Sequence, residues 1–276
     1  SWYIWIGFLI TRVALTSETR WLCPPSCHCN ATVLEVNCSG GQLTRVPDGL
    51  SQEARLLNLT HNTLKTLVRQ QFHTLTQLTL RLCRNHLKII PVGAFAGLTN
   101  LQLLDVSSNQ LLVFLDFTFS KLTSLRFMKA ADNDLVYVSH QAFTGLISLQ
   151  ELHLDGCNLT AMPMEALTQL SVLRSLSFHR LGLTTLPNYS FRHLVHLKEL
   201  VISHCPWLES LSGNSLFGLN LTSLTIKHGN LSSLPKTDCG FYLVTRMLFV
   251  AQDNFMSSMT DAFDICFTYY SPTSYL

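Results

Sequence analysis

Charged residues are scarce in this chain of 276 residues. Asp, Glu, Lys and Arg make up 13% of it, and the formal net charge is +2. Nucleic-acid binding requires a dense basic face, which so small a charge does not provide. The sequence also contains no run of about 18 apolar residues, the length that a membrane-spanning helix needs. Hydrophobic residues are abundant: they make up 47% of the chain, and leucine is the commonest of them. Such a composition excludes a disordered chain.

Sequence motifs of enzymes are absent as well. There is no Gly-x-Ser-x-Gly turn, no phosphate-binding loop, no His-Glu-x-x-His and no convincing pair of carboxylates. Each of these patterns brings a nucleophile, a phosphate cradle, a metal or an acid–base pair into one site. We therefore expect no catalytic function, no cofactor, no metal ion and no small-molecule substrate.

Glycosylation sequons and clustered cysteines indicate an oxidising compartment. Asn-x-Ser/Thr occurs seven times, more often than chance would suggest, and matters only in a protein that enters the secretory pathway. Four cysteines within sixteen residues predict a disulfide-bonded N-terminal cap, because their spacing is a poor match to zinc sites. The predicted glycosylation sites are Asn30, Asn37, Asn58, Asn158, Asn188, Asn220 and Asn230, and the cap cysteines are Cys23, Cys27, Cys29 and Cys38.

An internal repeat determines the predicted fold. The pattern Leu-x-x-Leu-x-Leu-x-x-Asn/Cys-x-Leu recurs from about Ala54 to Leu234, with a first spacing of 23 residues and 24 thereafter. This is the pattern of a leucine-rich repeat solenoid, in which short strands stack into a curved parallel sheet of horseshoe shape, an α/β architecture. We expect the Asn or Cys side chains to form a hydrogen-bonded ladder between repeats. Leu181 and Gly229 occupy the same position in their repeats but do not match the Asn or Cys of the pattern. The ladder residues are Asn62, Asn85, Asn109, Asn133, Cys157 and Cys205.

The repeat divides the chain into four parts. Residues 22–53 form the cap, and residues 54–235 form eight repeats with a recurring Phe in the second half of most of them. Residues 1–21 contain an apolar run of the length found in signal peptides; an interfacial helix is the alternative. Residues 236–276 contain a degenerate ninth repeat, with Leu248 and Val250 at repeat positions, and an irregular tail in which Cys239 and Cys266 could pair.

Proteins of this fold usually bind partners on the concave face of the sheet, at the exposed positions of the strands. Mixed charge at these positions favours a protein ligand over nucleic acid. A glycan on Asn58 would restrict the first strand, and Cys83 lies exposed on this face as a candidate free thiol. The alternative is that these positions are simply solvated, and the sequence does not decide between the two. The predicted partner-binding residues are Arg81, Arg84, Asp105, Lys129, Asp132, His153, His179 and Arg180.

Four histidines fall on neighbouring strands of the same face. They are His153, His179, His204 and His228. Two interpretations stay open: a strip that responds to pH or binds a metal, and ordinary surface histidines. The second is favoured, because no pattern of acidic partners accompanies them.

The stretch from Cys23 to Pro235 resembles the LINGO family, the leucine-rich repeat and immunoglobulin domain-containing Nogo receptor-interacting proteins. The resemblance rests on blocks outside the repeat consensus, among them residues 54–59, 132–137 and 218–224. The chain departs from the family in its short second repeat and in Gly229, where Cys is usual, and we expect it to be truncated after about eight repeats. The resemblance implies a cell-surface co-receptor that restrains neurite growth and myelination.

The same resemblance implies complexes with the Nogo receptor and neurotrophin-receptor partners, and self-association. The expected location is the secretory pathway, then the plasma membrane if a membrane helix follows in the full-length chain. The alternative is a secreted matrix-type or decoy glycoprotein without signalling.

Overall fold

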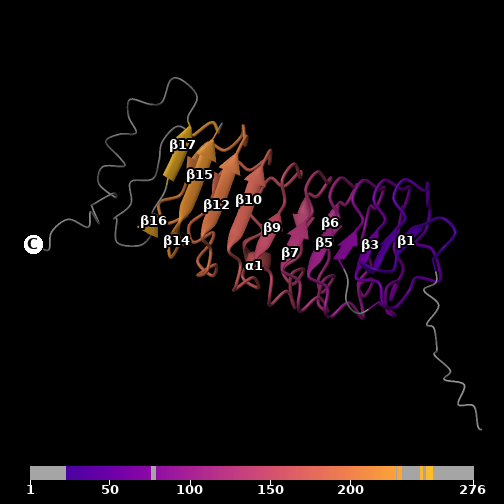
Figure 1. The fold of residues 1–276 in the computed structure, drawn as a ribbon. Coiled ribbons are helices and arrows are strands. Elements are labelled where there is room, and N and C mark those ends of the chain that lie inside the picture. Colours follow the sequence, from indigo (N-terminus) through magenta and orange to yellow (C-terminus); the bar gives the residue numbers. More distant parts are fainter. Residues whose placement is uncertain (1–22, 76–78, 228, 232–242, 245–246, 251–276) are drawn as a thin grey trace, which may run out of the picture.

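The computed structural model describes residues 23–75, 79–227, 229–231, 243–244 and 247–250. Within them the chain winds as a solenoid, and its strands lie side by side along one axis from β1 to β17 (Figure 1). The predicted leucine-rich repeat solenoid is confirmed. The proposed leader, Cys239, Cys266 and most of the predicted tail lie outside the described residues.

An 11-stranded sheet forms the concave side. Only its first pair, β1 and β2, is antiparallel, and every later neighbour is parallel. The strands in spatial order are β1 (His28–Asn30), β2 (Glu35–Asn37), β3 (Leu56–Asn58), β4 (Thr79–Arg81), β5 (Leu103–Asp105), β7 (Phe127–Lys129), β9 (Glu151–His153), β10 (Ser175–His179), β12 (Glu199–Ser203), β15 (Ser223–Lys227) and β17 (Met247–Val250).

The remaining described elements are short and lie off this sheet. A single helix, α1 (Met164–Leu167), occurs in the described part of the chain, so turns make most connections between strands. No described helix has the length and apolarity that crossing a membrane requires. Three two-stranded pairs complete the elements: β6 (Val113–Phe114) with β8 (Tyr137–Val138), β11 (Thr185–Leu186) with β13 (Ser210–Leu211), and β14 (Asn220–Leu221) with β16 (Leu243–Val244).

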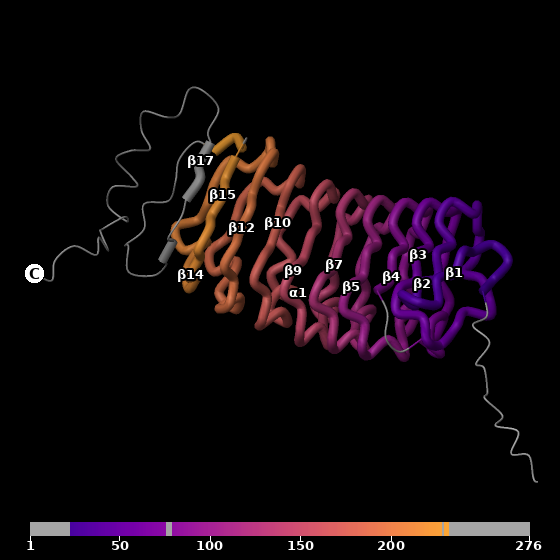
Figure 2. The backbone as a smooth tube through the Cα atoms, viewed as in Figure 1, coloured from indigo at the N-terminus to yellow at the C-terminus, as the bar shows by residue number. Residues whose placement is uncertain are grey.

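Strand register follows the repeat length. Leu57 pairs with Leu80 after 23 residues, and Leu80 pairs with Leu104 after 24. The last strand departs from prediction: Leu224 pairs with Met247 rather than with Leu248. The spacing from β15 to β17 is therefore one residue shorter than the usual repeat, and it equals the spacing from β3 to β4. Figure 2 shows the stacked turns that this regular spacing produces.

The core is a continuous apolar column inside the solenoid. Alternate strand residues such as Leu152 and Leu154 are fully buried, because successive side chains of a strand point to opposite faces. Beneath the convex turns, Phe72, Phe95 and Phe119 stack with ring centroids 6.1 Å apart. No repeat can bury its apolar face alone, so stability depends on contacts between neighbours.

An amide ladder lies at the turn after each of the first strands. The Nδ2 atom of Asn109 donates to the carbonyls of Leu82 and Val106, both at 3.0 Å, and its Oδ1 accepts from the Leu87 N–H. Asn62, Asn85 and Asn133 make the same kind of contacts. These side chains satisfy backbone groups that the turn would otherwise leave buried and unpaired.

The later ladder positions are weaker. Cys157 donates its thiol to the Ala130 carbonyl at 3.5 Å, and Cys205 does so to the Phe178 carbonyl at 3.7 Å. Burial raises the pKa of Cys157 to about 11 and also raises the pKa of Cys205. Both thiols are therefore structural and poorly reactive near neutral pH.

Candidate functional site

The concave face presents a row of side chains that we call the central column. Strand pairing aligns them one above the other, and the column mixes basic, acidic and polar groups. Arg81 and Lys129 are exposed, and the others are half-buried. The column thus offers a chemically varied surface on a rigid sheet. Its members are Asn58, Arg81, Asp105, Lys129, His153, Ser177, Val201 and Thr225.

A second row, which we call the rim, lies where each strand turns toward the ladder. All its members have φ between +51° and +65°, the left-handed conformation that reverses the chain direction. The rim brings together predicted partner-binding residues that the central column does not contain, namely Arg84, Asp132 and Arg180. Its members are His61, Arg84, Ser108, Asp132, Gly156, Arg180 and His204.

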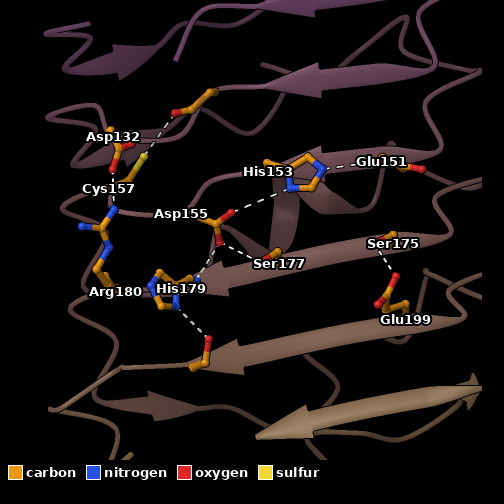
Figure 3. A network of polar contacts seen from close by, with 12 residues as sticks. Asp132, Glu151, His153, Asp155, Cys157, Ser175, Ser177, His179, Arg180 and Glu199 are labelled. Atoms are coloured by element: carbon orange, nitrogen blue, oxygen red, sulfur yellow. Dashed lines mark hydrogen bonds and ion pairs between the residues drawn. The ribbon is translucent and has the colours of Figure 1, made fainter. Parts of the chain in front are cut away.

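Gly156 makes room for an ion pair that spans two repeats. The Arg180 Nη2 atom lies 2.6 Å from Asp132 Oδ1, across the position of Gly156 (Figure 3). A Cβ atom at Gly156 would approach Asp132 Oδ1 at 2.5 Å, so any other residue there would make the ion pair shift from this geometry. Both charged side chains are more than half exposed, and exposed pairs add little stability. The pair instead fixes the orientation of two charges at the rim.

Asp155 organises the polar network at the centre of the concave face. Its Oδ1 accepts hydrogen bonds from Ser177 Oγ at 2.7 Å and from the His179 backbone N–H at 2.8 Å, and its Oδ2 lies 3.7 Å from His153 Nδ1 (Figure 3). The His179 ring in turn contacts Ser203 Oγ at 2.8 Å. We call Glu151, His153, Asp155, Ser177, His179 and Ser203 the Asp155 network.

Charge within the Asp155 network favours a protonated His153. The neighbouring Asp155 carboxylate raises the pKa of His153 above its ordinary value, which outweighs the opposing effect of burial, and Glu151 acts in the same direction. Burial would raise the pKa of Asp155, but His153, Ser177 and the His179 N–H together lower it. The network therefore favours the ionised form of Asp155 and the protonated form of His153.

This pKa shift predicts that His153 stabilises the fold more in acid than in base. A histidine whose pKa is raised by folding contributes stability below its unfolded pKa and loses it as pH rises through the folded value. We expect the loss in urea midpoint caused by His153→Gln to be larger at about pH 5.5 than at about pH 8. Equal losses at both pH values would contradict the assignment.

A matched control is His140→Gln. His140 also has a carboxylate 3.7 Å away, that of Glu165, but its side chain is 68% exposed. Solvent screens such a pair, so we expect His140→Gln to change the urea midpoint little in either buffer.

The structure corrects two expectations about the concave face. Acidic partners do accompany one histidine, because Glu151 on β9 and Asp155 in the turn after β9 each place a carboxylate oxygen 3.7 Å from the His153 ring. The spacing of Glu151, His153 and Asp155 in the sequence is the signal that could have indicated these contacts. Cys83 is half-buried rather than exposed, 3.4 Å from Thr60 Oγ1, and burial raises the pKa of its thiol. His228 lies outside the described residues.

The four cap cysteines form two disulfides, Cys23–Cys29 and Cys27–Cys38. Among the described residues, no group of three His, Cys, Asp or Glu side chains is placed to hold a metal ion. Disulfides persist in oxidising compartments, so the cap indicates the secretory pathway.

The predicted glycosylation sites spread over several faces. Asn37 and Asn58 lie half-buried at the ends of β2 and β3, and Asn188 accepts a hydrogen bond from the Asn214 N–H in a convex turn. Their glycosylation stays a prediction. The exposed sites are Asn30, Asn158, Asn188, Asn220 and Asn230.

Comparison with known proteins supports the assignment of fold and cap. The leucine-rich repeat model matches residues 79–135 and 147–206, and the leucine-rich repeat N-terminal domain model matches residues 23–51. Among solved structures, the crystal structure of a TLR13–ssRNA13 complex aligns with a TM-score of 0.63 and 34% identity, over 65% of this chain and 26% of that one.

Curated relatives match shorter stretches. Leucine-rich repeat and immunoglobulin-like domain-containing nogo receptor-interacting protein 1 of Xenopus tropicalis is 57% identical over 47 residues, which cover 17% of this chain and 8% of that protein. Amphoterin-induced protein 1 of Homo sapiens is 38% identical over 102 residues, 36% of this chain and 20% of that protein. The chain thus spans only a small part of each. The chain belongs to the leucine-rich repeat family and carries a leucine-rich repeat N-terminal domain.

Proposed function

We propose that this chain binds a protein partner on its concave face, as part of a neuronal cell-surface co-receptor that restrains neurite growth and myelination. The Asp155 network is the observation that carries the proposal. Its side chains are held in place before any partner arrives, so binding would cost little conformational entropy. Leucine-rich repeat solenoids commonly bind through such extended concave surfaces.

The choice of partner rests on similarity. The stretch that matches nogo receptor-interacting protein 1 at 57% identity favours the Nogo receptor and neurotrophin-receptor complexes as ligands. The central column alternates Arg81, Asp105 and Lys129, an arrangement that suits a partner with charges of both signs. A continuous phosphate backbone would instead meet a carboxylate between the two cations.

A charge reversal on the concave face tests this proposal. We expect Lys129→Glu to weaken binding of the glycosylated chain to the immobilised Nogo receptor ectodomain or neurotrophin-receptor ectodomain by about tenfold, since one reversed contact at an interface is worth roughly 1.4 kcal/mol or more. Surface plasmon resonance measures the change. Lys121→Glu is the matched control, because Lys121 is also exposed but lies in a turn outside the sheet. No binding by the unmodified chain, or equal loss in both variants, would overturn the proposal.

The alternative is a secreted matrix-type or decoy glycoprotein that binds without signalling. Expression of the full-length gene product in neurons separates the two. Neurite outgrowth that falls only when the protein is anchored in the signalling cell supports the co-receptor, whereas equal inhibition by purified chain supports the decoy.

A further inference from the structure

Two glycosylation sequons lie next to each other at one end of the concave face. Asn37 of β2 pairs in register with Asn58 of β3, and Asn58 pairs with Arg81 of β4. Asn58 is therefore the first member of the central column, and Asn37 extends that column toward the cap. The other five sequon asparagines lie outside the central column.

The local hydrogen bonds leave the reactive nitrogen of both side chains available. Asn37 Oδ1 accepts from the Ser39 N–H and Asn58 Oδ1 accepts from the Thr60 N–H, each at 3.1 Å. Each bond uses the amide oxygen, and Nδ2 of neither side chain makes a hydrogen bond within the described residues. The ladder residue Asn62 is the contrast, since its Nδ2 donates to the buried Cys38 and Leu59 carbonyls.

Glycosylation of these residues is a group transfer from a lipid-linked oligosaccharide. A bond forms between Asn Nδ2 and C1 of the first sugar, and the bond from C1 to the pyrophosphate oxygen breaks. Nδ2 loses one proton, which in the net reaction balances the charge of the departing lipid pyrophosphate. The attached oligosaccharide is bulky and hydrated. Strands in a sheet lie about 4.8 Å apart, so one oligosaccharide is wider than the strand that carries it.

We propose that glycans on Asn37 and Asn58 cover the cap-proximal end of the concave face, from β2 to β4, and thereby confine protein partners to the region from β5 to β15. This inference rests on the proposed function for the existence of a concave partner and adds where that partner binds. Four strand spacings, about 19 Å, separate Asn58 on β3 from His153 on β9. The Asp155 network therefore remains open while Arg81 is covered. Of the three charged column residues named under the proposed function, Asp105 on β5 and Lys129 on β7 then stay available to a partner, and Arg81 does not.

Cysteine reporters in the central column test the shielding. Arg81→Cys lies next to Asn58, and Ser177→Cys lies within the Asp155 network. Each reporter, in protein secreted from animal cells, is labelled with N-ethylmaleimide and with a maleimide carrying polyethylene glycol of about 5 kDa; peptide mass spectrometry identifies the labelled cysteine. The same labelling is repeated with Ser39→Ala and Thr60→Ala combined, which removes both sequons and keeps both asparagines.

We expect removal of the two sequons to raise the ratio of large-probe to small-probe labelling at Arg81→Cys by at least about tenfold, and at Ser177→Cys by less than about twofold. Asn37→Gln with Asn58→Gln gives a second route to the same unglycosylated surface. Thr160→Ala, which removes only the Asn158 sequon, serves as the control and should leave both ratios unchanged.

Two results would overturn the inference: an absence of glycan mass on the peptides that contain Asn37 and Asn58, or an unchanged labelling ratio at Arg81→Cys. Neither result bears on whether the concave face binds a partner, because Lys129→Glu tests that separately. Conversely, shielding at Arg81→Cys together with unaltered partner binding by Lys129→Glu would reject the proposed function and leave the glycan cover in place.

Discussion

Replacing Gly145 by alanine is expected to destabilise the solenoid by roughly 3–5 kcal/mol, the combined cost of backbone strain and of overpacking against rigid atoms. A Cβ atom at this position would overlap the Ser120 carbonyl oxygen and lie 2.8 Å from the Ser120 Cα. Those atoms belong to the backbone of the preceding repeat and cannot rotate away. Gly145 also has a φ of +92°, a backbone conformation that residues with a side chain rarely adopt. Urea unfolding followed by circular dichroism measures the loss.

Two other glycines separate the effect of backbone strain from that of overpacking. Gly93 has a φ of +84° but nothing within 4 Å of the added Cβ, so Gly93→Ala should show the strain alone, about 1–2 kcal/mol. Gly213 has neither feature, and Gly213→Ala should change stability by no more than about 1 kcal/mol. If Gly145→Ala were no more destabilising than Gly93→Ala, the close contact with the Ser120 backbone would not contribute to the loss of stability.

The repeat pattern in the sequence predicts most of the fold because the same contacts recur every 23 or 24 residues. Once Asn109 is assigned to the ladder, the positions of Leu104 and Val106 in the core follow from strand alternation. The recurring Phe residues in the core are predicted for the same reason, but the sequence does not show where this series stops being fully buried. Phe217 is half-buried and packs edge-on against Tyr189 with centroids 5.3 Å apart.

The candidate site is less predictable than the fold. Strand alternation places Glu151 and His153 on the same face, but Asp155 lies in the turn beyond β9, and its hydrogen bonds join two different repeats. The ion pair between Asp132 and Arg180 joins residues 48 positions apart. Nothing in the repeat consensus indicates that Gly156 would leave space for it.

Truncating a central ladder residue should be the second most damaging change. Asn109→Ala leaves the Leu87 N–H without its buried acceptor, and the Leu82 and Val106 carbonyls each lose one of two amide donors and keep the other, from Asn85 and Asn133. We expect a cost of roughly 1–3 kcal/mol. Water cannot easily replace the amide, because Asn109 is only 8% exposed. The effect should appear as a lower urea midpoint.

The chain itself supplies the comparison for this prediction. Cys157 and Cys205 keep a weak thiol donor at ladder positions, whereas Leu181 is buried there with no polar side-chain atom. Asn109→Cys should therefore be less destabilising than Asn109→Leu, although leucine buries more apolar surface. The opposite order would mean that packing, rather than the pairing of backbone groups, determines which residue occupies the ladder. In that case Cys157 and Cys205 would be tolerated for their size, and the thiol contacts with the Ala130 and Phe178 carbonyls would contribute nothing.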